Sequence, residues 1–445
     1  MKTRLESEVT APAGLTAIRP MRILVFPEYA VEKPHVVVDT VYTGLLPARG
    51  HSVTAIRPAR SVSKLECGAA PWGAGELITF PDEPFGSAIS NIPRATRRAR
   101  WLRRTTEQLS FSRVDVVLVR NDLQSALLVS RLSRRLGIPF LFQISSPDAE
   151  FRTNASEPAG LGGYYSRMRG RIDRHLRRRV CHDSTAVLAI SAEMRRYLAE
   201  ADGIAADKIF SFPMGIGSAP VPGAEKVLEI RRRLALPVGS TMVYSGVVDS
   251  VRSPGIMLDI LEKVRAVVPD AALLLLTYQQ DERRVAFEAE ARSRGLPVTI
   301  IGPLHHSEVS CHLACADVVL SPYPPRIEHF MCSPTKSIEG MALGLPVVGN
   351  EEVVEHVRLL REAGGGLAVP YDPDAFARAI VFLMQNPKEG HRIGEAGRKW
   401  ATAHRSYERL TRYLESILLA AVEKRPLADL LHDPDLALAD GSACS

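Results

Sequence analysis

The chain has 445 residues, of which 46% are hydrophobic and 24% are charged, and its formal net charge is +6. At roughly 100–200 residues per domain, this length predicts two or three domains, and the composition excludes a disordered chain and a fibrous repeat. The positive excess is too small by itself to indicate nucleic-acid binding. The 6 cysteines follow no disulfide-scaffold spacing, and no apolar run reaches the roughly 18–20 residues of a membrane-spanning helix. We therefore expect a cytoplasmic protein.

The first half of the chain alternates between strand-like and helical patterns. Residues 1–20 hold acidic residues and prolines before the first apolar run, and we expect a loose leader there rather than a signal peptide. The alternation that follows predicts a doubly wound α/β domain over residues 21–217. Its expected strands are 21–26, 51–56, 114–119, 138–144, 186–190 and 209–213, and its expected helices are 36–46 and 123–136.

A segment rich in glycine and proline, 215–223, reads as a linker, and a second alternating series follows it. This series predicts a second doubly wound domain over 218–400, then a crossover helix within 401–424 and a tail at 425–445. Two such domains leave a cleft at the carboxyl ends of their strands, where α/β proteins bind ligands. The expected strands are 241–244, 271–276, 298–301, 318–321 and 346–349, and the expected helices are 253–268, 283–293, 307–315, 335–343, 373–385 and about 405–422.

The densest motif lies in residues 333–348 (SPTKSIEGMALGLPVV). It resembles the donor-binding helix of glycosyltransferases with the two-domain GT-B fold, specifically family 4 of retaining enzymes. The similarity covers roughly residues 21–424, and it implies two Rossmann-like domains facing a cleft, with a C-terminal helix that crosses back to the N-terminal domain. It also implies a nucleotide-sugar donor on the C-terminal domain and an acceptor on the N-terminal one. Supporting stretches occur in the family's order at 49–53, 209–217, 244–246 with Arg252, and 394–398.

The chemistry of this helix can also be read directly from its residues. Pro334 suits a first helical turn, and the unpaired N–H groups that follow it lie at the positive end of a helix dipole, which favours an anion. Lys336 adds a full charge, and Glu339, about one turn further, can accept hydrogen bonds from two vicinal ribose hydroxyls. A nucleoside diphosphate would satisfy all these groups. The alternative is an amphipathic helix with a solvated Lys/Glu face.

Arg252 falls where the resemblance places a lysine that holds the diphosphate. Negative charge develops on the leaving phosphate, so Arg252, Lys336 and the helix N-terminus can stabilise it, and we expect neither a metal nor a cofactor. The three residues assigned to catalysis are Arg252, Lys336 and Glu339. The resemblance implies retention, with the leaving phosphate accepting the acceptor proton. A surface loop arginine is the alternative for Arg252.

The chain departs from the family pattern at two positions. Val247 stands where an arginine usually follows the glycine of the first turn, and Met331 stands where the first of two glutamates is usual, with Glu328 three residues before it. We therefore expect the donor hexose to be held mostly by backbone N–H groups of residues 330–333. The donor-side candidates are Gly246, Gly302, Pro303, Leu304, Glu328, Phe330, Met331, Cys332, Ser333, Pro334 and Thr335.

Polar residues after strand ends of the first half are the candidates for binding the acceptor. The carboxyl-end rule places them at the cleft, although a cap or turn role suits each of them equally. No protein base is assigned among them, because the retaining reaction implied by the resemblance does not need one. The candidates are Glu28, Asn121, Asp122, Ser145, Ser146 and Asp148.

Two arginine-rich segments account for the positive charge: residues 94–104 hold six arginines and residues 167–179 hold seven. In the second, Tyr165, Met168 and Ile172 form an apolar stripe beside the arginines, with Leu176 one turn further. Such a helix can lie on anionic lipid headgroups, which predicts a peripheral protein on the inner face of the membrane. A solvated surface and a site for an anionic acceptor remain open. No recognisable nucleic-acid module accompanies the arginines.

Two weaker patterns are set aside. Cys311, His312 and Cys315 could suggest zinc, but their spacing fits the buried side of a helix. Residues 73–75 begin a loose dinucleotide-like pattern that follows no strand, and we expect a loop there. The sequence predicts a glycosyltransferase that moves a hexose-type sugar to a hydroxyl acceptor, such as a lipid-linked saccharide, a polysaccharide precursor or a small natural product. The alternatives are a non-catalytic protein that binds sugar nucleotides and a nucleotide-sugar epimerase.

Overall fold

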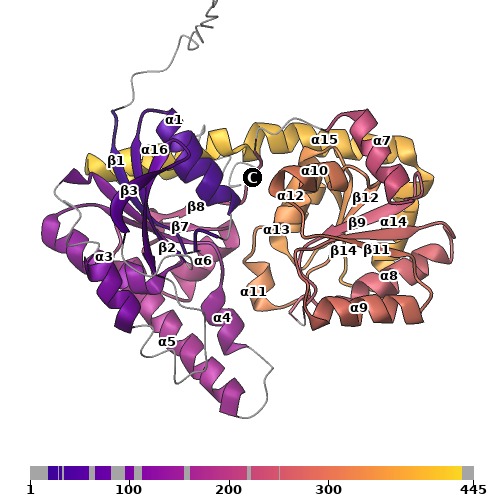
Figure 1. The fold of residues 1–445 in the computed structure, drawn as a ribbon, viewed down its shortest axis with the longest axis horizontal. Coiled ribbons are helices and arrows are strands. Elements are labelled where there is room, and N and C mark those ends of the chain that lie inside the picture. Colours follow the sequence, from indigo (N-terminus) through magenta and orange to yellow (C-terminus); the bar gives the residue numbers. More distant parts are fainter. Residues whose placement is uncertain are drawn as a thin grey trace, which may run out of the picture.

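The computed structural model describes residues 19–28, 30–32, 35–59, 66–81, 96–104, 113–154, 161–217, 222–249 and 251–432. They form two α/β domains that lie side by side and are bridged by helices from the end of the chain (Figure 1). Most of the expected leader, the end of the expected tail and Arg94 lie outside the described residues. Among the helices of the described part, none is both long enough and apolar enough to cross a membrane.

The N-terminal domain is built on an eight-stranded sheet of order β3-β4-β2-β1-β5-β6-β7-β8. Neighbouring strands are parallel except for the antiparallel pair β3–β4. The central strands are buried along their length because helices cover both faces of the sheet. The bounds are Arg22–Phe26 (β1), Ser52–Ala59 (β2), Glu66–Trp72 (β3), Gly75–Pro81 (β4), Val116–Arg120 (β5), Phe140–Ile144 (β6), Ala186–Ala189 (β7) and Ile209–Ser211 (β8).

The helices of this domain begin at readable signals. Asp122 caps α3 by accepting hydrogen bonds from the N–H groups of Gln124 and Ser125, and Gly137 ends that helix in the left-handed conformation. Ser191 caps α6 in the same way through Met194 N–H. The bounds are Val38–Leu45 (η1, a π-helix), Leu46–Ala48 (α1), Leu123–Leu136 (α3), Asp148–Thr153 (α4), Leu161–Asp183 (α5), Ala192–Glu200 (α6) and Ala206–Lys208 (η3).

The C-terminal domain has a six-stranded sheet of order β11-β10-β9-β12-β13-β14, and all its strand pairs are parallel. Its strands are Thr241–Ser245 (β9), Ala272–Leu276 (β10), Val298–Ile301 (β11), Val318–Ser321 (β12), Val347–Asn350 (β13) and Gly366–Val369 (β14). Its helices are Ala224–Arg233 (α7), Gly255–Arg265 (α8), Glu282–Ser293 (α9), His306–Leu313 (α10), Ile327–Phe330 (α11), Thr335–Ala342 (α12), Val354–His356 (α13), Val357–Glu362 (η4, a π-helix) and Pro373–Gln385 (α14).

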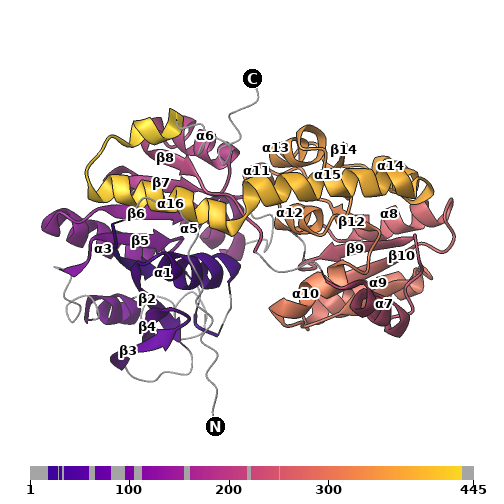
Figure 2. The same cartoon turned by 90° about the horizontal axis from the view of Figure 1, so that it is seen from above.

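The end of the chain crosses from the C-terminal domain to the N-terminal one, as the sequence predicted. The crossover consists of two helices, α15 (Pro387–Arg405) and α16 (Tyr407–Val422), which run end to end over the two domains (Figure 2). They are separated at Ser406, whose backbone is extended and pairs with Ile216 of the linker. A short 3₁₀ turn, Leu427–His432 (η5), follows.

Both crossover helices are anchored by buried carboxylates. Glu415 of α16 accepts a hydrogen bond from His51 Nε2 at 2.7 Å and pairs with Arg49 at 2.5 Å. His51 Nδ1 accepts the N–H of Met21, so its proton is on Nε2. Arg405, at the end of α15, forms a buried ion pair with Glu355 of the C-terminal domain. The crossover is therefore tied to the C-terminal domain by an ion pair at the junction of its two helices, and to the N-terminal domain by one within α16.

The doubly wound prediction is confirmed, but several elements were missed, including the helices α4, α6, α11 and α13. The hairpin β3–β4 and strand β14 escaped prediction because glycine and proline interrupt or precede their short apolar runs. Helices α7 and α15 were missed because charged residues dominate them and their buried sides are narrow. Residues 73 and 74 form a turn as expected, but the strand β3 precedes it and Gly75 already begins β4, contrary to the prediction.

Candidate functional site

The first group of candidate residues meets where β9 and β12 end beside the start of α12. Gly246 follows β9 with a φ of +153°, and a Cβ added to it would lie 2.9 Å from Lys336 Cε. Glycine is favoured there because L side chains rarely adopt this φ, and the lysine side chain lies directly against the turn. The turn and the helix are therefore packed as one unit, with the ammonium group between them.

Lys336 lies between two aromatic rings. Its Nζ is 4.9 Å from the ring centre of Tyr244 and 4.8 Å from that of Tyr323, and it donates a hydrogen bond to the Tyr323 hydroxyl at 3.3 Å. Burial, together with the positive charge of Arg252, lowers the pKa of Lys336 to about 8. Among the described residues Lys336 has no ion-pair partner. Its positive charge is therefore available to attract an anion that binds here.

Glu339 lies one turn further along α12 and is also desolvated. Burial raises the pKa of Glu339 to about 7, and the nearby Lys336 opposes that rise. In the part of the chain that the structure describes, no hydrogen bond reaches its carboxylate. A group that donates two hydrogen bonds, such as a vicinal diol, would stabilise its charged form.

Arg252 stands in the turn between β9 and α8. Its Nη1 pairs with Asp249 Oδ2 at 2.5 Å, and its backbone N–H donates to Asp249 Oδ1 at 2.9 Å. About one third of its side chain is exposed, and its charge acts on Lys336. The structure therefore brings together Gly246, Arg252, Lys336 and Glu339, and Asp249 is the partner that sequence reasoning missed.

A buried chain of hydrogen bonds supports the first turn of α12. His356 is fully buried, and burial lowers its pKa to about 4, so the ring is neutral. Its Nδ1 donates to the Asn350 carbonyl at 3.0 Å, and Nε2 accepts from the Ser321 hydroxyl at 3.2 Å. Ser321 in turn accepts from the Ser337 hydroxyl at 3.0 Å. These residues were not predicted, because their spacing along the chain carries no motif.

The segment before α12 turns toward the N-terminal domain. Glu328 is buried and accepts a hydrogen bond from Asn154 of that domain at 3.3 Å. Met331 is buried in the hydrophobic cluster of the N-terminal domain, so its side chain does not face the charged group. Burial raises the pKa of Cys332 to about 12. Ser333 Oγ accepts the N–H of Met214 at 3.2 Å.

The expected cradle of backbone N–H groups at residues 330–333 is largely occupied. The N–H groups of Phe330, Met331 and Cys332 already donate to carbonyls of Arg326 and His329, because α11 is a single helical turn. The available donors of this segment are shifted toward the start of α12, to Ser333 and the first helical residues, Thr335 and Lys336. Pro334 carries no N–H and sits at the helix cap.

Residues 302–304 follow β11 at the edge of the sheet. A Cβ on Gly302 would lie 1.9 Å from the carbonyl oxygen of Thr277, so the glycine is required by the close approach of these two backbones. A cis peptide joins Gly302 to Pro303, and Leu304 packs against the core under α12. Because β10 separates β11 from β9, this group lies further along the cleft edge than Gly246.

On the N-terminal side, three candidates form one hydrogen-bonded group. Asn121 adopts a left-handed backbone with a φ of 55°, and its Nδ2 donates to Glu28 Oε2 and to Ser145 Oγ, each at 2.7 Å. Its Oδ1 accepts Ser145 N–H at 2.7 Å. Burial raises the pKa of Glu28, and the neighbouring Asp148 adds to the rise. The group presents a partly exposed carboxylate at the strand ends.

The remaining N-terminal candidates make local contacts. Ser146 Oγ donates to Asp148 Oδ1 at 2.5 Å. Asp122 caps α3 and also pairs with Arg98 at 2.6 Å, so its carboxylate is engaged within the domain. Arg120, a buried arginine at the end of β5, was missed; its Nη1 lies 3.6 Å from Glu28 Oε2. The sequence pattern that could have identified Arg120 is a charged residue at the end of an otherwise apolar strand.

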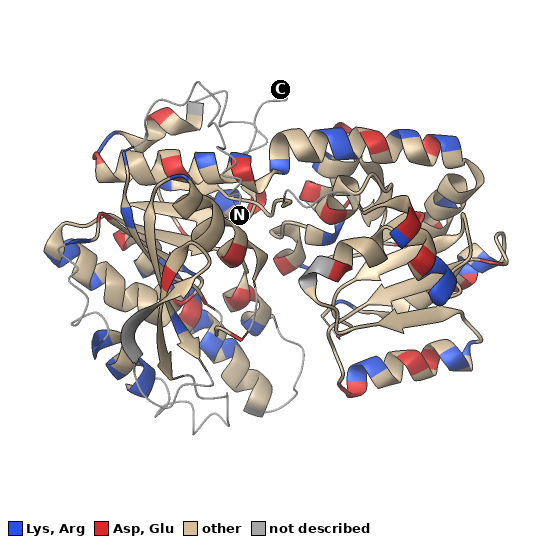
Figure 3. Cartoon of the chain, turned by 45° about the horizontal axis from the view of Figure 1, so that its top comes forward, with Lys and Arg blue, Asp and Glu red and all other residues tan. Residues whose placement is uncertain are grey.

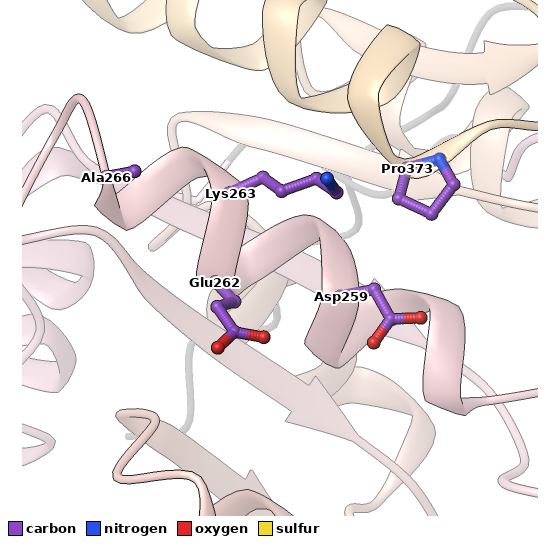
Figure 4. Close-up of a pocket in the computed structure, with 5 residues that line it drawn as sticks. All are labelled: Asp259, Glu262, Lys263, Ala266 and Pro373. Atoms are coloured by element: carbon purple, nitrogen blue, oxygen red, sulfur yellow. The ribbon is translucent and has the colours of Figure 1, made fainter.

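Two features lie apart from this site. Figure 4 shows the residues that line a pocket between α8 and the start of α14, none of which is a candidate: Asp259, Glu262, Lys263, Ala266 and Pro373. The cysteine and histidine pattern of α10 is satisfied within its own helix, since His312 and Cys315 bond to backbone carbonyls one turn earlier. Within the described ranges, no three histidine, cysteine or acidic side chains gather as a metal site.

Two family models match the chain: residues 42–215 match the one described as glycosyl transferase 4-like domain, and residues 240–386 match the one described as glycosyl transferases group 1. Together they cover more than half of the chain. A curated relative, a GDP-mannose-dependent alpha-(1-6)-phosphatidylinositol monomannoside mannosyltransferase of Mycobacterium tuberculosis, is 26% identical over 267 residues. That match covers 56% of this chain and 65% of the relative, just under two thirds of the relative's length.

Solved structures share the architecture over nearly the whole chain. A sucrose-phosphate synthase from Thermosynechococcus elongatus has a TM-score of 0.71 and 16% identity, covering 91% of this chain and 100% of that one. The Anabaena protein HepE, in complex with UDP and glucose, has a TM-score of 0.63 and 13% identity, covering 90% and 100%. WaaG, a glycosyltransferase involved in lipopolysaccharide biosynthesis, has a TM-score of 0.64 and 17% identity, covering 89% and 99%. At these identities the likeness is one of fold.

Proposed function

Because the chain belongs to the GT-B glycosyltransferases of the family-4-like type, we propose that it transfers a hexose-type sugar from a nucleotide diphosphate sugar to a hydroxyl acceptor. The observation that carries this proposal is the pair Lys336 and Glu339 at the start of α12. Both are desolvated, and among the described residues neither has an ion partner of its own. A nucleoside diphosphate supplies phosphates for the first and ribose hydroxyls for the second.

In the proposed reaction, the bond between the anomeric carbon and the diphosphate oxygen breaks, and the acceptor oxygen bonds to that carbon on the same face. Charge then develops on the leaving phosphate, where Lys336, Arg252 and the free N–H groups at the start of α12 stabilise it. The leaving phosphate accepts the proton of the acceptor hydroxyl, which gives retention without a protein base. Three fixed positive groups serve the leaving group, so the proposal needs neither a metal nor a cofactor.

The acceptor is proposed to bind at the strand ends of the N-terminal domain. Glu28, oriented by Asn121, offers a partly exposed carboxylate oxygen that can accept a hydrogen bond from a sugar or alcohol hydroxyl. Ser146 and Asp148 extend the same polar edge. The curated relatives act on a phosphatidylinositol monomannoside, so mannosides and lipid-linked saccharides are the first acceptors to test, with GDP-mannose and UDP-glucose as the first donors.

A cytoplasmic protein held at an anionic membrane surface is the proposed location. The outward face of α5 exposes Tyr164, Met168 and Ile172, with exposed fractions of 64%, 42% and 46%. Figure 3 colours the Lys and Arg positions of the chain blue. Among those of α5, Arg171, Arg174 and Arg178 line a surface hollow together with His175. Apolar groups next to a basic hollow suit acyl chains next to phosphate headgroups.

Not every arginine of that helix takes part in the proposed surface. Arg177 is buried and pairs with Glu150 at 2.7 Å and with Asp202 at 2.8 Å, so it holds α5 against α4 and α6. In the other basic segment, Arg98 is engaged with Asp122. Binding to phosphatidylcholine vesicles with and without phosphatidylglycerol tests this proposal. The variant M168E/I172E is expected to lose binding to the anionic vesicles; unchanged binding would contradict the assigned face.

The function is tested by a thermal-shift screen of GDP, UDP and ADP with their sugars, followed by transfer assays with the nucleotide that binds. A ligand that binds only the folded state raises the melting temperature, by an amount that grows with its concentration over Kd. Release of free nucleoside diphosphate upon addition of acceptor is the expected result. Failure of every nucleotide to bind would refute the assigned site.

A second candidate, a protein that binds sugar nucleotides without transferring them, is favoured by Val247 and by the burial of Met331 away from the site. It predicts tight nucleotide binding without turnover across a broad acceptor panel. An epimerase on the same fold predicts conversion of the nucleotide sugar when no acceptor is present. The transfer assay run with and without acceptor separates these three outcomes.

A further inference from the structure

The loop from Pro322 to Pro334, called here the interdomain loop, leads directly into α12. On one side it contacts the groups assigned to the donor. Tyr323 N–H donates to Asn350 Oδ1 at 2.8 Å, and the Tyr323 ring lies beside the Lys336 ammonium. The ring of His329 packs edge-on against Tyr323 with 5.5 Å between ring centres. The loop, Lys336 and the start of α12 are therefore packed together as parts of the C-terminal domain.

On its other side the interdomain loop is held by the N-terminal domain. Met331 is 3% exposed, and it is the one described residue between 222 and 405 that belongs to the N-terminal hydrophobic cluster. Its carbonyl accepts a hydrogen bond from the Ser191 hydroxyl at 2.7 Å. Ser191 Oγ is itself fixed, because as the cap of α6 it accepts Met194 N–H at 3.0 Å. An apolar side chain and a directed hydrogen bond thus hold the same residue.

Three further contacts connect this loop to the N-terminal domain. Glu328 accepts from Asn154 at 3.3 Å, and the ring of His329 meets Phe151 edge-on at 5.8 Å. Ser333, which precedes α12, accepts Met214 N–H at 3.2 Å. The second half of the loop, from Glu328 to Ser333, is therefore held by the N-terminal domain up to the start of α12.

We propose that Met331 and Ser191 are positioning residues through which the N-terminal domain sets the geometry of the donor site for transfer. The inference rests on the proposed function. Met331 occupies the place where the resembled family has a glutamate, and in this chain the residue at that place anchors the domain interface. The nucleotide is bound by Arg252, Lys336 and Glu339, all on the C-terminal domain. Nucleotide binding should thus survive loss of the anchor, and transfer should not.

The test compares M331A and S191A with the wild-type protein in two measurements. Calorimetry with GDP and UDP gives the nucleotide Kd, and an assay of nucleoside diphosphate release gives kcat. We expect kcat to fall at least about tenfold in M331A and less in S191A, while Kd stays within about twofold, because small displacements of reacting groups are costly to rate. M331L, which restores an apolar side chain of similar volume, is expected to recover most of the lost kcat.

Leu383→Ala is the matched control, since Leu383 is equally buried but lies on α14 in the core of the C-terminal domain. It should lower the melting temperature without lowering kcat at a temperature where the variant is folded. If M331A behaves like L383A, or if M331A loses nucleotide affinity in proportion to kcat, the positioning role is refuted. If the wild-type protein neither binds a nucleotide nor transfers, it is the proposed function that fails.

Discussion

The two sides of the cleft differ in how their charged groups are balanced. On the C-terminal side, Lys336 and Glu339 are desolvated without ion partners, and their pKa values move in opposite directions, to about 8 and about 7. On the N-terminal side, Glu28 is already bonded to Asn121, which is bonded to Ser145. The first side lacks counter-groups that a ligand would supply, whereas on the second Glu28 already has a hydrogen-bond donor and an arginine 3.6 Å away.

This difference has a thermodynamic consequence. Desolvating a charge without a partner costs stability, so the C-terminal site should gain both order and stability when an anion binds. The hydrogen-bonded group of Glu28, Asn121 and Ser145 gains little stability from an added ligand, and its main effect is to orient the acceptor. We therefore expect substitutions of Lys336 and Glu339 to change nucleotide affinity and rate together, and substitutions in the group of Glu28, Asn121 and Ser145 to change the use of the acceptor alone.

The largest effect is expected from Lys336→Ala. Removing the one ammonium group beside Tyr244 and Tyr323 should lower kcat by about 10²–10³-fold, since it removes charge stabilisation in a desolvated site. Nucleoside diphosphate affinity should fall as well. Initial rates and calorimetric Kd values measure the two effects, and K336M, which keeps the apolar stem, should be equally impaired. A rate within twofold of that of the wild-type protein would refute the role of Lys336 in stabilising the leaving phosphate.

Glu339→Gln should weaken nucleoside diphosphate binding by about tenfold, because a neutral amide accepts weaker hydrogen bonds from ribose hydroxyls. Calorimetric titration of GDP and UDP into the variant and the wild-type protein measures this change. The loss should be smaller for a nucleotide without the ribose hydroxyls. An equal loss for both nucleotides would show that Glu339 does not contact the ribose.

The same residue predicts a pH dependence. Burial raises the folded-state pKa of Glu339 to about 7, so the folded protein holds a proton that the unfolded chain has already released. The wild-type protein should then lose stability relative to E339Q as the pH rises from about 4.5 through 7, by up to about 3 kcal/mol. Urea unfolding of both proteins at pH 5 and pH 8 checks the sign. A constant difference between them would contradict the raised pKa.

A smaller effect is expected on the N-terminal side from Asn121→Gly. Glycine tolerates the left-handed backbone at this position, so the substitution removes the side chain without adding strain. Loss of the hydrogen bond to Glu28 should lower kcat/KM for the acceptor by about fivefold and leave nucleotide Kd unchanged. In Asn121→Ala the alanine must also adopt the left-handed backbone, so this variant should be less stable to unfolding than Asn121→Gly. A change in nucleotide Kd would show that the two sides are not separable.

Most of the fold and the C-terminal site could be predicted because their signals are local in sequence. Alternating apolar runs gave both sheets, and Lys336 and Glu339 lie one turn apart in a single helix. Arg252 was assigned through the resemblance, because it falls where that family places a lysine after the glycine turn at Gly246. The hairpin β3–β4 and strand β14 were missed because local glycine and proline obscured pairings that only distant strands complete.

The parts that could not be predicted depend on contacts between distant segments. The hydrogen-bonded chain from Ser337 to His356 joins three elements and has no fixed spacing. The orientation of Met331 depends on a pocket formed by the other domain, so the sequence suggested a donor contact where the structure shows an interface contact. The backbone N–H groups expected to be free were occupied because the single turn of α11 was not foreseen.

The smallest effect on activity is expected from Glu415→Gln, which weakens the brace between α16 and the N-terminal domain without touching either site. Although burial opposes it, hydrogen bonds from His51 and Arg49 hold the pKa of Glu415 below its ordinary value. Its contribution is therefore present at neutral pH and is lost as the pH falls through the folded-state pKa. The variant should lose about 2 kcal/mol of stability at pH 7 and less in acid. Its kcat should stay within about twofold of wild type, since the hydrogen bond that anchors Met331 comes from Ser191 at the cap of α6 and is left intact.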